Sequence, residues 1–153
     1  TGTGGIINVS SELDKSGGPA IARYISKTIT LLDGFDAGDI RTFVTAVKPA
    51  TANVQVYFKV RNTLDPEQIE DKYWVKMTQI GNEYLYSTNG DPIEYEFRPS
   101  LTSNNTTYTS GGATYTTFNQ YKVKIVLASS STLYQDVPFL YDVRAIAMPA
   151  DAY

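Results

Sequence analysis

The chain has 153 residues, with no histidine, no cysteine and a formal net charge of −3. The missing histidine and cysteine exclude catalytic sites built on Ser-His or Cys-His pairs, and zinc sites built on those two residue types. Lysine and arginine are scattered, which argues against a nucleic-acid-binding face, and no apolar run approaches the ~20 residues that cross a bilayer. The composition therefore favours a structural or binding module over an enzyme.

The first part of the chain differs from the rest in composition. Residues 1–19 are rich in glycine and serine and include Ser16-Gly17-Gly18-Pro19, a stretch typical of a linker. We expect residues 1–19 to form a linker or N-terminal arm and residues 20–153 to form one domain, because this length suits a single core. Since the chain begins with threonine, we also expect it to be a processed product or a piece of a longer polypeptide.

Beyond the arm, the pattern is that of short strands separated by turns. The alternation is cleanest in residues 53–60, where a valine or phenylalanine occupies every second position, so we expect one face on a core and the other near water. The other predicted strands span residues 23–31, 40–48, 74–77, 93–98, 120–127 and 139–148. This number of strands, with almost no helix, predicts an all-β fold: an antiparallel β-sandwich or jelly roll of about eight strands.

Two segments between the predicted strands are strongly polar. In residues 65–71, Asp65 followed by Pro66 predicts a loop with one helical turn, because proline suits the first helical position. Residues 99–117 consist almost wholly of Ser, Thr, Asn, Gly and Tyr, which indicates a loop or a weak hairpin. The same composition is found in the contact loops of binding proteins.

Two groups of carboxylates deserve a test as sites. Asp33, Asp36 and Asp39 could hold calcium, but their spacing is not that of an EF-hand loop and suits a plain turn, so we expect no metal. The acidic residues of 65–71 lie beside Tyr73 and Trp74, as in a glycosidase site. They are neighbours on one loop, however, whereas that chemistry needs two carboxyls that face each other across a cleft. We therefore expect no catalytic residue and no cofactor.

One charged residue lies within the last predicted strand. Arg144 is flanked by Val143, Ala145 and Ile146, and the alternation places it on the same face as Asp142. We favour a structural ion pair, with Asp142 or an aspartate of a loop, over a ligand contact.

Three stretches together resemble a known family. They are Arg23-Tyr24-Ile25-Ser26-Lys27 with Leu31 and residues 33–37; residues 54–60 with Asp65-Pro66 and Trp74; and residues 121–127 with Pro138 and residues 142–147. In this order they are similar to the β-sandwich domain near the end of large structural proteins in the tails and baseplates of contractile-tailed bacteriophages, especially those of marine cyanobacteria. The resemblance covers residues 20–149. It implies a virion structural component without catalytic residues.

The leading hypothesis is a virion structural module of a tail, baseplate or fibre that acts through subunit interfaces. Its partners would be other virion proteins and copies of itself, without nucleic acid or membrane insertion. The alternative is a receptor- or glycan-binding module of a tail fibre. Its candidate ligand-binding residues are aromatic side chains in or beside loops, namely Trp74, Tyr84, Tyr86, Tyr108 and Tyr115. Exposed rings would favour binding, and buried rings would favour assembly.

Overall fold

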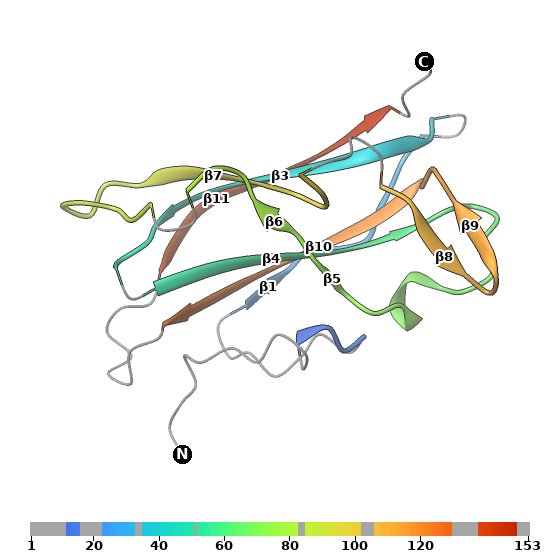
Figure 1. Cartoon of the computed structure of the whole chain (residues 1–153), viewed down its shortest axis with the longest axis horizontal. Helices are drawn as coiled ribbons and strands as arrows, with labels where there is room; N and C mark the ends of the chain where they lie inside the picture. The colour runs from blue at the N-terminus through green and yellow to red at the C-terminus, as the bar shows by residue number, and fades with distance from the viewer. Residues whose placement is uncertain are drawn as a thin grey trace.

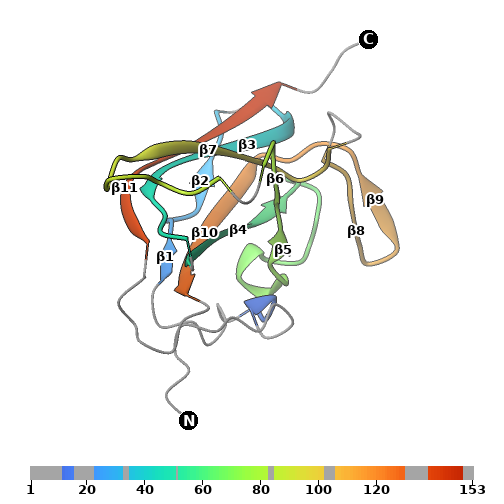
Figure 2. The same cartoon turned by 60° about the vertical axis from the view of Figure 1, so that its left-hand side comes forward.

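The computed structural model describes residues 12–15, 23–32, 35–50, 52–82, 85–101, 106–129 and 138–149. They form two antiparallel sheets that pack face to face, with a separate hairpin at one end (Figures 1 and 2). This arrangement confirms the predicted all-β, sandwich-like fold; the jelly-roll connection stays a prediction. In the described part of the chain, no helix is long and apolar enough to span a membrane.

The strands of each sheet come from distant parts of the sequence. Sheet A has the order β1 (Arg23–Ile25), β10 (Gln120–Ser129), β4 (Ala52–Arg61) and β5 (Val75–Lys76), and β2 (Ile29–Thr30) also pairs with β10. Sheet B has the order β11 (Phe139–Pro149), β3 (Ala37–Val47), β7 (Ile93–Arg98) and β6 (Thr78–Gln79). The hairpin pairs β8 (Tyr108–Ser110) with β9 (Ala113–Tyr115), within the predicted polar segment. One helical turn is present in this segment, the 3-10 helix η1 (Ile69–Asp71), but its N-cap is Gln68, so Pro66 is not at the first helical position as predicted.

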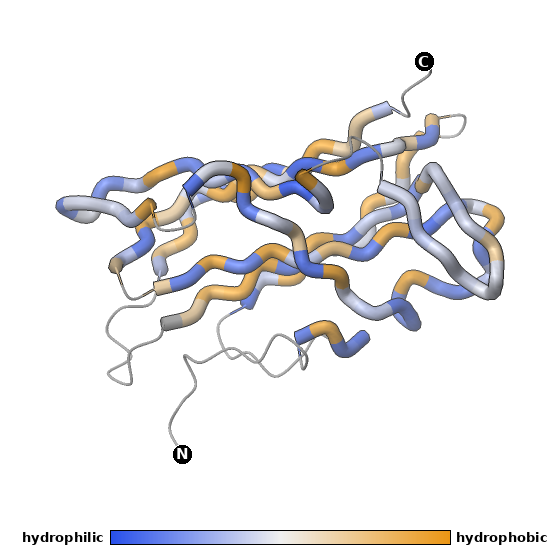
Figure 3. The backbone as a smooth tube through the Cα atoms, in the orientation of Figure 1, coloured by the Kyte–Doolittle hydropathy of each residue, from blue (hydrophilic) through white to orange (hydrophobic). Residues whose placement is uncertain are grey.

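The main core lies between the two sheets. Apolar residues alternate with polar ones along the long strands, as the hydropathy colouring of Figure 3 shows. One alternate set from each sheet packs into a single buried cluster. The buried cluster includes Val56 and Phe58 of β4, Ile125 of β10 and Val44 of β3. One side of the sandwich is closed by residues 75–79, which pass from β5 to β6 and so from sheet A to sheet B (Figure 1).

The outer face of sheet A is buried as well, and here the prediction from the sequence was wrong. Alternation placed the second face of residues 53–60 near water. Tyr57 on this face of β4 is nevertheless 0% exposed, and so is Lys124 on the neighbouring strand β10. The cover consists of residues 12–15 and Trp74, which lie over this face. A second apolar cluster of Tyr57, Trp74 and Val126 results, with Leu13 packed against it.

Residues 12–15 belong to the predicted arm, and specific contacts hold them on the sheet. The Trp74 N–H donates to the Leu13 carbonyl (2.9 Å), and Lys59 Nζ donates to the Lys15 carbonyl (3.0 Å). Lys124 Nζ forms a buried ion pair with the Glu12 carboxylate (3.0 Å). The predicted boundary between residues 19 and 20 lies outside the described residues and stays a prediction.

Candidate binding site at the Asp65 network

The loop that follows β4 is built by short-range hydrogen bonds of its own polar residues. The Asn62 side-chain oxygen accepts from the Leu64 N–H (2.8 Å), and the Asp65 N–H donates to the Asn62 carbonyl (3.0 Å). Asp65 Oδ1 in turn accepts from the Glu67 N–H (3.0 Å), just before η1. Asn and Asp favour such turns because their short side chains reach backbone groups two residues further on. The outcome is a fully buried Asp65 carboxylate.

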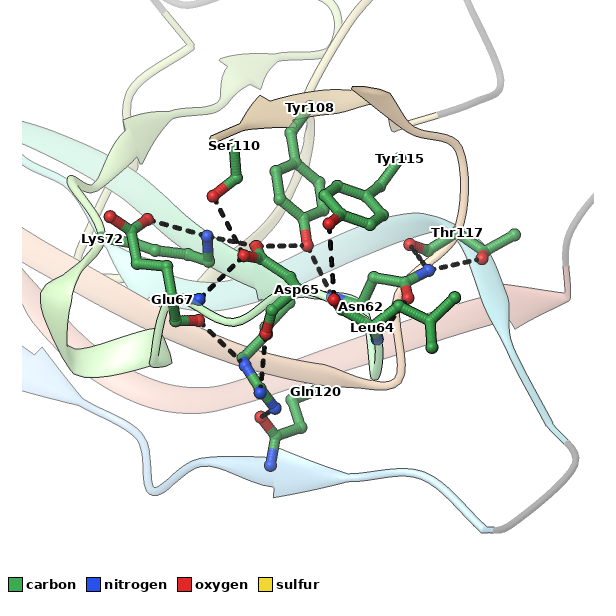
Figure 4. A network of polar contacts seen from close by, with 11 residues as sticks. Asn62, Leu64, Asp65, Glu67, Lys72, Tyr108, Ser110, Tyr115, Thr117 and Gln120 are labelled. Carbon is green, nitrogen blue, oxygen red and sulfur yellow. Dashed lines mark hydrogen bonds and ion pairs between the residues drawn. The ribbon is translucent and has the colours of Figure 1, made fainter. Parts of the chain in front are cut away.

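Asp65 connects segments that are distant in the sequence. Its Oδ2 accepts from Lys72 Nζ (2.6 Å) and from the Tyr108 hydroxyl (2.8 Å), and its Oδ1 accepts from the Ser110 hydroxyl (3.0 Å) (Figure 4). Lys72 Nζ also contacts Glu67 Oε1 (2.9 Å). We call Asp65, Glu67, Lys72, Tyr108 and Ser110 the Asp65 network.

The hydrogen bonds set the charge state of Asp65. Burial raises the pKa of this carboxyl, but hydrogen bonds from Lys72, the Glu67 backbone, Tyr108 and Ser110 outweigh burial and lower the pKa from 3.8 to about 2. Burial and the Asp65 carboxylate also raise the pKa of the Tyr108 hydroxyl, which therefore stays protonated as a donor. Asp65 is thus a permanent, fully bonded anion at neutral pH and is unsuited to exchange protons with a substrate.

The network fixes the β8–β9 hairpin, which pairs with no strand of sheet A or B among the described residues. An isolated two-stranded hairpin is marginally stable in water, so its position depends on side-chain contacts. Tyr108 supplies three of them. Its hydroxyl donates to Asp65 Oδ2 (2.8 Å) and accepts from the Asn62 N–H (2.6 Å), and Lys72 Nζ lies 4.8 Å from its ring centroid. Within the hairpin, the Tyr108 ring stacks on Tyr115 (5.2 Å between centroids).

A pocket of about 270 Å³ opens beside the network. It lies between the edge of β4, the segment after η1 and the strand β8 with the two threonines before it. The lining residues are Phe58, Lys59, Val60, Glu67, Lys72, Tyr73, Val75, Thr106, Thr107, Tyr108 and Thr109. Phe58 and Val60 are buried, whereas Tyr73 and Glu67 are exposed, so the pocket has an apolar interior and a polar, aromatic mouth.

The structure distributes the predicted ligand-binding rings over separate places. Trp74 is buried between Lys59 and Lys124, with Nζ atoms 4.8 and 5.3 Å from its ring, so it cannot offer that ring to a ligand. Tyr86 is half-buried beside Lys48 (5.1 Å). Tyr84 lies outside the described residues.

Among the predicted rings in the described part of the chain, only Tyr108 and Tyr115 are brought together, and of these Tyr108 alone lines the pocket. Tyr115 covers one part of the Tyr108 ring and Lys72 approaches it as well, so Tyr108 has little ring surface left for stacking on a ligand. The ligand-binding role of this pair stays a prediction.

The other charged candidates also have defined positions. Glu67 shares Lys72 with Asp65 and does not face it across a cleft. Asp39 is buried and accepts from the Thr106 hydroxyl (3.2 Å), while Asp33 lies outside the described residues. Within the described ranges, no group of three or more Asp, Glu, His or Cys residues could hold a metal ion.

Arg144 forms the predicted ion pair with Asp142, but only at 4.0 Å. Its shorter contact is with Glu94 of β7, at 2.9 Å. The prediction from the sequence missed Glu94 because the two strands are not neighbours; Arg144 reaches across β3, over the ring of Phe43 (5.2 Å).

Sequence reasoning missed the buried lysines. Lys48, Lys59, Lys72 and Lys124 are all buried, and each has its Nζ over at least one aromatic ring. Burial, together with the nearby Lys122, lowers the pKa of Lys59 to about 8. The sequence did contain an indication that this face is covered. Tyr57, a large aromatic residue, lies beside Lys59 on the face that the alternation places near water.

Comparison with known proteins gives no match: no family model, no curated protein and no solved structure matches this chain.

Proposed function

We propose that this chain is a structural module of a virion, in a tail, baseplate or fibre, and that it acts by joining subunits, not by catalysis. The setting comes from the sequence resemblance to phage tail and baseplate domains. The mode of action rests on the architecture, and above all on the exposed edge strand β11. Its partners in this proposal are copies of itself and other virion proteins.

Strand β11 has the features of an assembly edge. It is an 11-residue strand at the end of sheet B, and among the described residues no strand pairs with its outer side. Phe139, Tyr141 and Ile146 on this strand are 72%, 64% and 45% exposed. A long edge presents unpaired N–H and C=O groups, which makes it a template for pairing with a further strand.

The charges of β11 favour a second copy of β11 as the partner. If two β11 strands pair antiparallel around a two-fold axis at Val143, Asp142 of one copy lies opposite Arg144 of the other. Opposite charges in directly facing positions stabilise a strand pair, and like charges destabilise it. Registers centred on Asp142 or Arg144 would place like charges opposite each other. The strand is therefore self-complementary in one register, as a two-fold interface requires.

Charge exchange tests this pairing. All variants in this experiment carry Glu94→Gln, which removes the shorter of the two ion pairs that Arg144 forms within the chain. We expect sedimentation velocity to show a concentration-dependent dimer in the Glu94→Gln background. Asp142→Arg or Arg144→Asp alone should weaken the dimer about tenfold, and the double exchange should restore it.

Leu32→Lys serves as the control, because Leu32 is 84% exposed but lies outside β11. This variant should associate like its parent. A monomer at all concentrations, or a double exchange as weak as the single variants, would contradict the proposed edge.

A second candidate function is a receptor- or glycan-binding module of a tail fibre. The specific observation in its favour is the pocket beside the Asp65 network, which lies on the opposite side of the sandwich from β11. The two functions are compatible because the edge of β11 and the pocket beside the Asp65 network have no residue in common.

A further inference from the structure

We propose that the pocket beside the Asp65 network binds one neutral sugar residue of a glycan, with Glu67 and the threonines of the β8 segment contacting its hydroxyl groups. This inference rests on the second candidate function and gives it a site and a ligand class. It is independent of the β11 edge.

Size limits what the pocket accepts. Its volume of about 270 Å³ lies just below the range of roughly 300–1,000 Å³ typical of sites for drug-sized molecules. One ring with its substituents is the matching occupant, and a long lipid chain is too large.

The lining matches the two-sided chemistry of a sugar ring. Phe58 and Val60 provide an apolar interior for C–H groups. Glu67, Thr107 and Thr109 supply acceptors and donors for hydroxyl groups.

Two side chains at the mouth keep free capacity. The Glu67 carboxylate uses Oε1 for Lys72 and retains its second oxygen, and its side chain is 46% exposed. Tyr73 is 64% exposed; Lys15 Nζ lies 5.4 Å from its ring centroid, and the rest of the ring surface can contact a C–H face of the ligand.

Charge balance favours a neutral ligand over an acidic one. The Lys72 ammonium faces two carboxylates, Asp65 at 2.6 Å and Glu67 at 2.9 Å. The Lys59 ammonium donates to the backbone carbonyls of Lys15 and Glu70. Both ammonium groups therefore already donate to acceptors of the chain, and the exposed Glu67 carboxylate at the mouth repels an anionic ligand.

The walls of the pocket are held in place before any ligand arrives. Asp65 binds the Glu67 backbone, the Lys72 ammonium and the Tyr108 hydroxyl, and it does not itself line the pocket. Such fixed walls reduce the entropy that a ligand loses on binding, which matters most for a small ligand with few contacts.

Titration with simple glycosides tests the proposal. The probes are methyl α-glucoside, methyl β-galactoside and N-acetylglucosamine, with glucuronate as the acidic comparison and triglycine as the peptide comparison. Binding is followed by ligand-observed NMR and by chemical shifts of the protein. We expect saturable millimolar binding of at least one neutral glycoside, with shifts at Thr107 and Tyr73, and about tenfold weaker binding of glucuronate.

Two matched variants locate the site. Glu67→Gln should weaken binding about tenfold or more, because it removes a charged acceptor. Glu94→Gln should leave binding unchanged, although Glu94 resembles Glu67 in exposure (51% against 46%) and in its ion pair of 2.9 Å. Thermal unfolding of both variants confirms that they are folded.

Three outcomes would overturn the proposal. No saturable binding of any neutral glycoside would do so, as would binding that Glu67→Gln leaves unchanged, or a preference for glucuronate or triglycine. The sedimentation experiment on β11 is unaffected by these outcomes, so failure of the sugar site and failure of the assembly edge can be told apart.

Discussion

The substitution Asp65→Asn tests whether one buried carboxylate holds the loop after β4 and the hairpin together. The pKa of Asp65 falls from 3.8 in an unfolded chain to about 2 in the native protein. Each pKa unit corresponds to about 1.36 kcal/mol, so ionised Asp65 contributes about 2 kcal/mol at neutral pH. Asp65→Asn should therefore lower the free energy of unfolding by at least that amount, since it also leaves Lys72 with one carboxylate fewer.

The direction of the pKa shift determines how the stability contribution of Asp65 changes with pH. Because the pKa is lowered on folding, the contribution is fully present above pH 4 and is lost as the pH falls toward 2. By pH 3 about half of it should be gone. The difference between wild type and Asp65→Asn should therefore shrink by about 1 kcal/mol from pH 7 to pH 3.

Urea unfolding followed by the fluorescence of Trp74 provides the assay, because Trp74 is the only tryptophan and is buried. Glu94→Gln is the control: its ion pair is exposed and should change stability by less than about 1 kcal/mol. An Asp65→Asn variant as stable as wild type, or one equally destabilised at pH 7 and pH 3, would refute the role assigned to Asp65.

Two further predictions concern the covered face of sheet A. Glu12→Gln leaves the Lys124 ammonium buried without its carboxylate, so the free energy of unfolding measured in urea should fall by about 3 kcal/mol. The double variant Glu12→Gln/Lys124→Met should recover most of this loss. A double variant as unstable as Glu12→Gln would contradict the prediction. The pKa of Lys59 is lowered from 10.5 in the unfolded chain to about 8 in the folded protein. Between pH 8 and pH 10.5 the unfolded chain therefore binds more protons than the folded protein, and the stability of wild type relative to Lys59→Met should rise with pH in this range. Parallel pH profiles of the two proteins would show that Lys59 does not titrate as described.

The fold was predictable from local patterns because alternation and turn residues act over a few positions. The alternating residues of β4 and β10 and the turn residues around Asp65 and Pro66 indicated strands and one helical turn, and both are present. The cover of sheet A was not predictable in this way. It depends on residues 12–15 and Trp74 meeting Lys59 and Lys124 across long distances in the sequence, and periodicity carries no information on such contacts.

The candidate site was predicted only in fragments. The acidic loop and the polar, tyrosine-containing segment were each recognised, but nothing in either indicated that Asp65 would bond Tyr108 and Ser110. Trp74 was misjudged because it packs over the outer face of sheet A, against Tyr57 and the ammonium groups of Lys59 and Lys124, and nothing in its local sequence indicates that contact.

Hydrogen exchange along β11 tests the central claim, that this protein works by pairing its exposed sheet edge, most directly. The amides of residues 139–149 are measured in dilute and in concentrated protein. Those that point away from β3 should exchange fast in the dilute sample and become protected on association, and Arg144→Asp should raise the protein concentration needed for the same protection about tenfold. Association that leaves these amides fast, or that protects another surface instead, would contradict the claim.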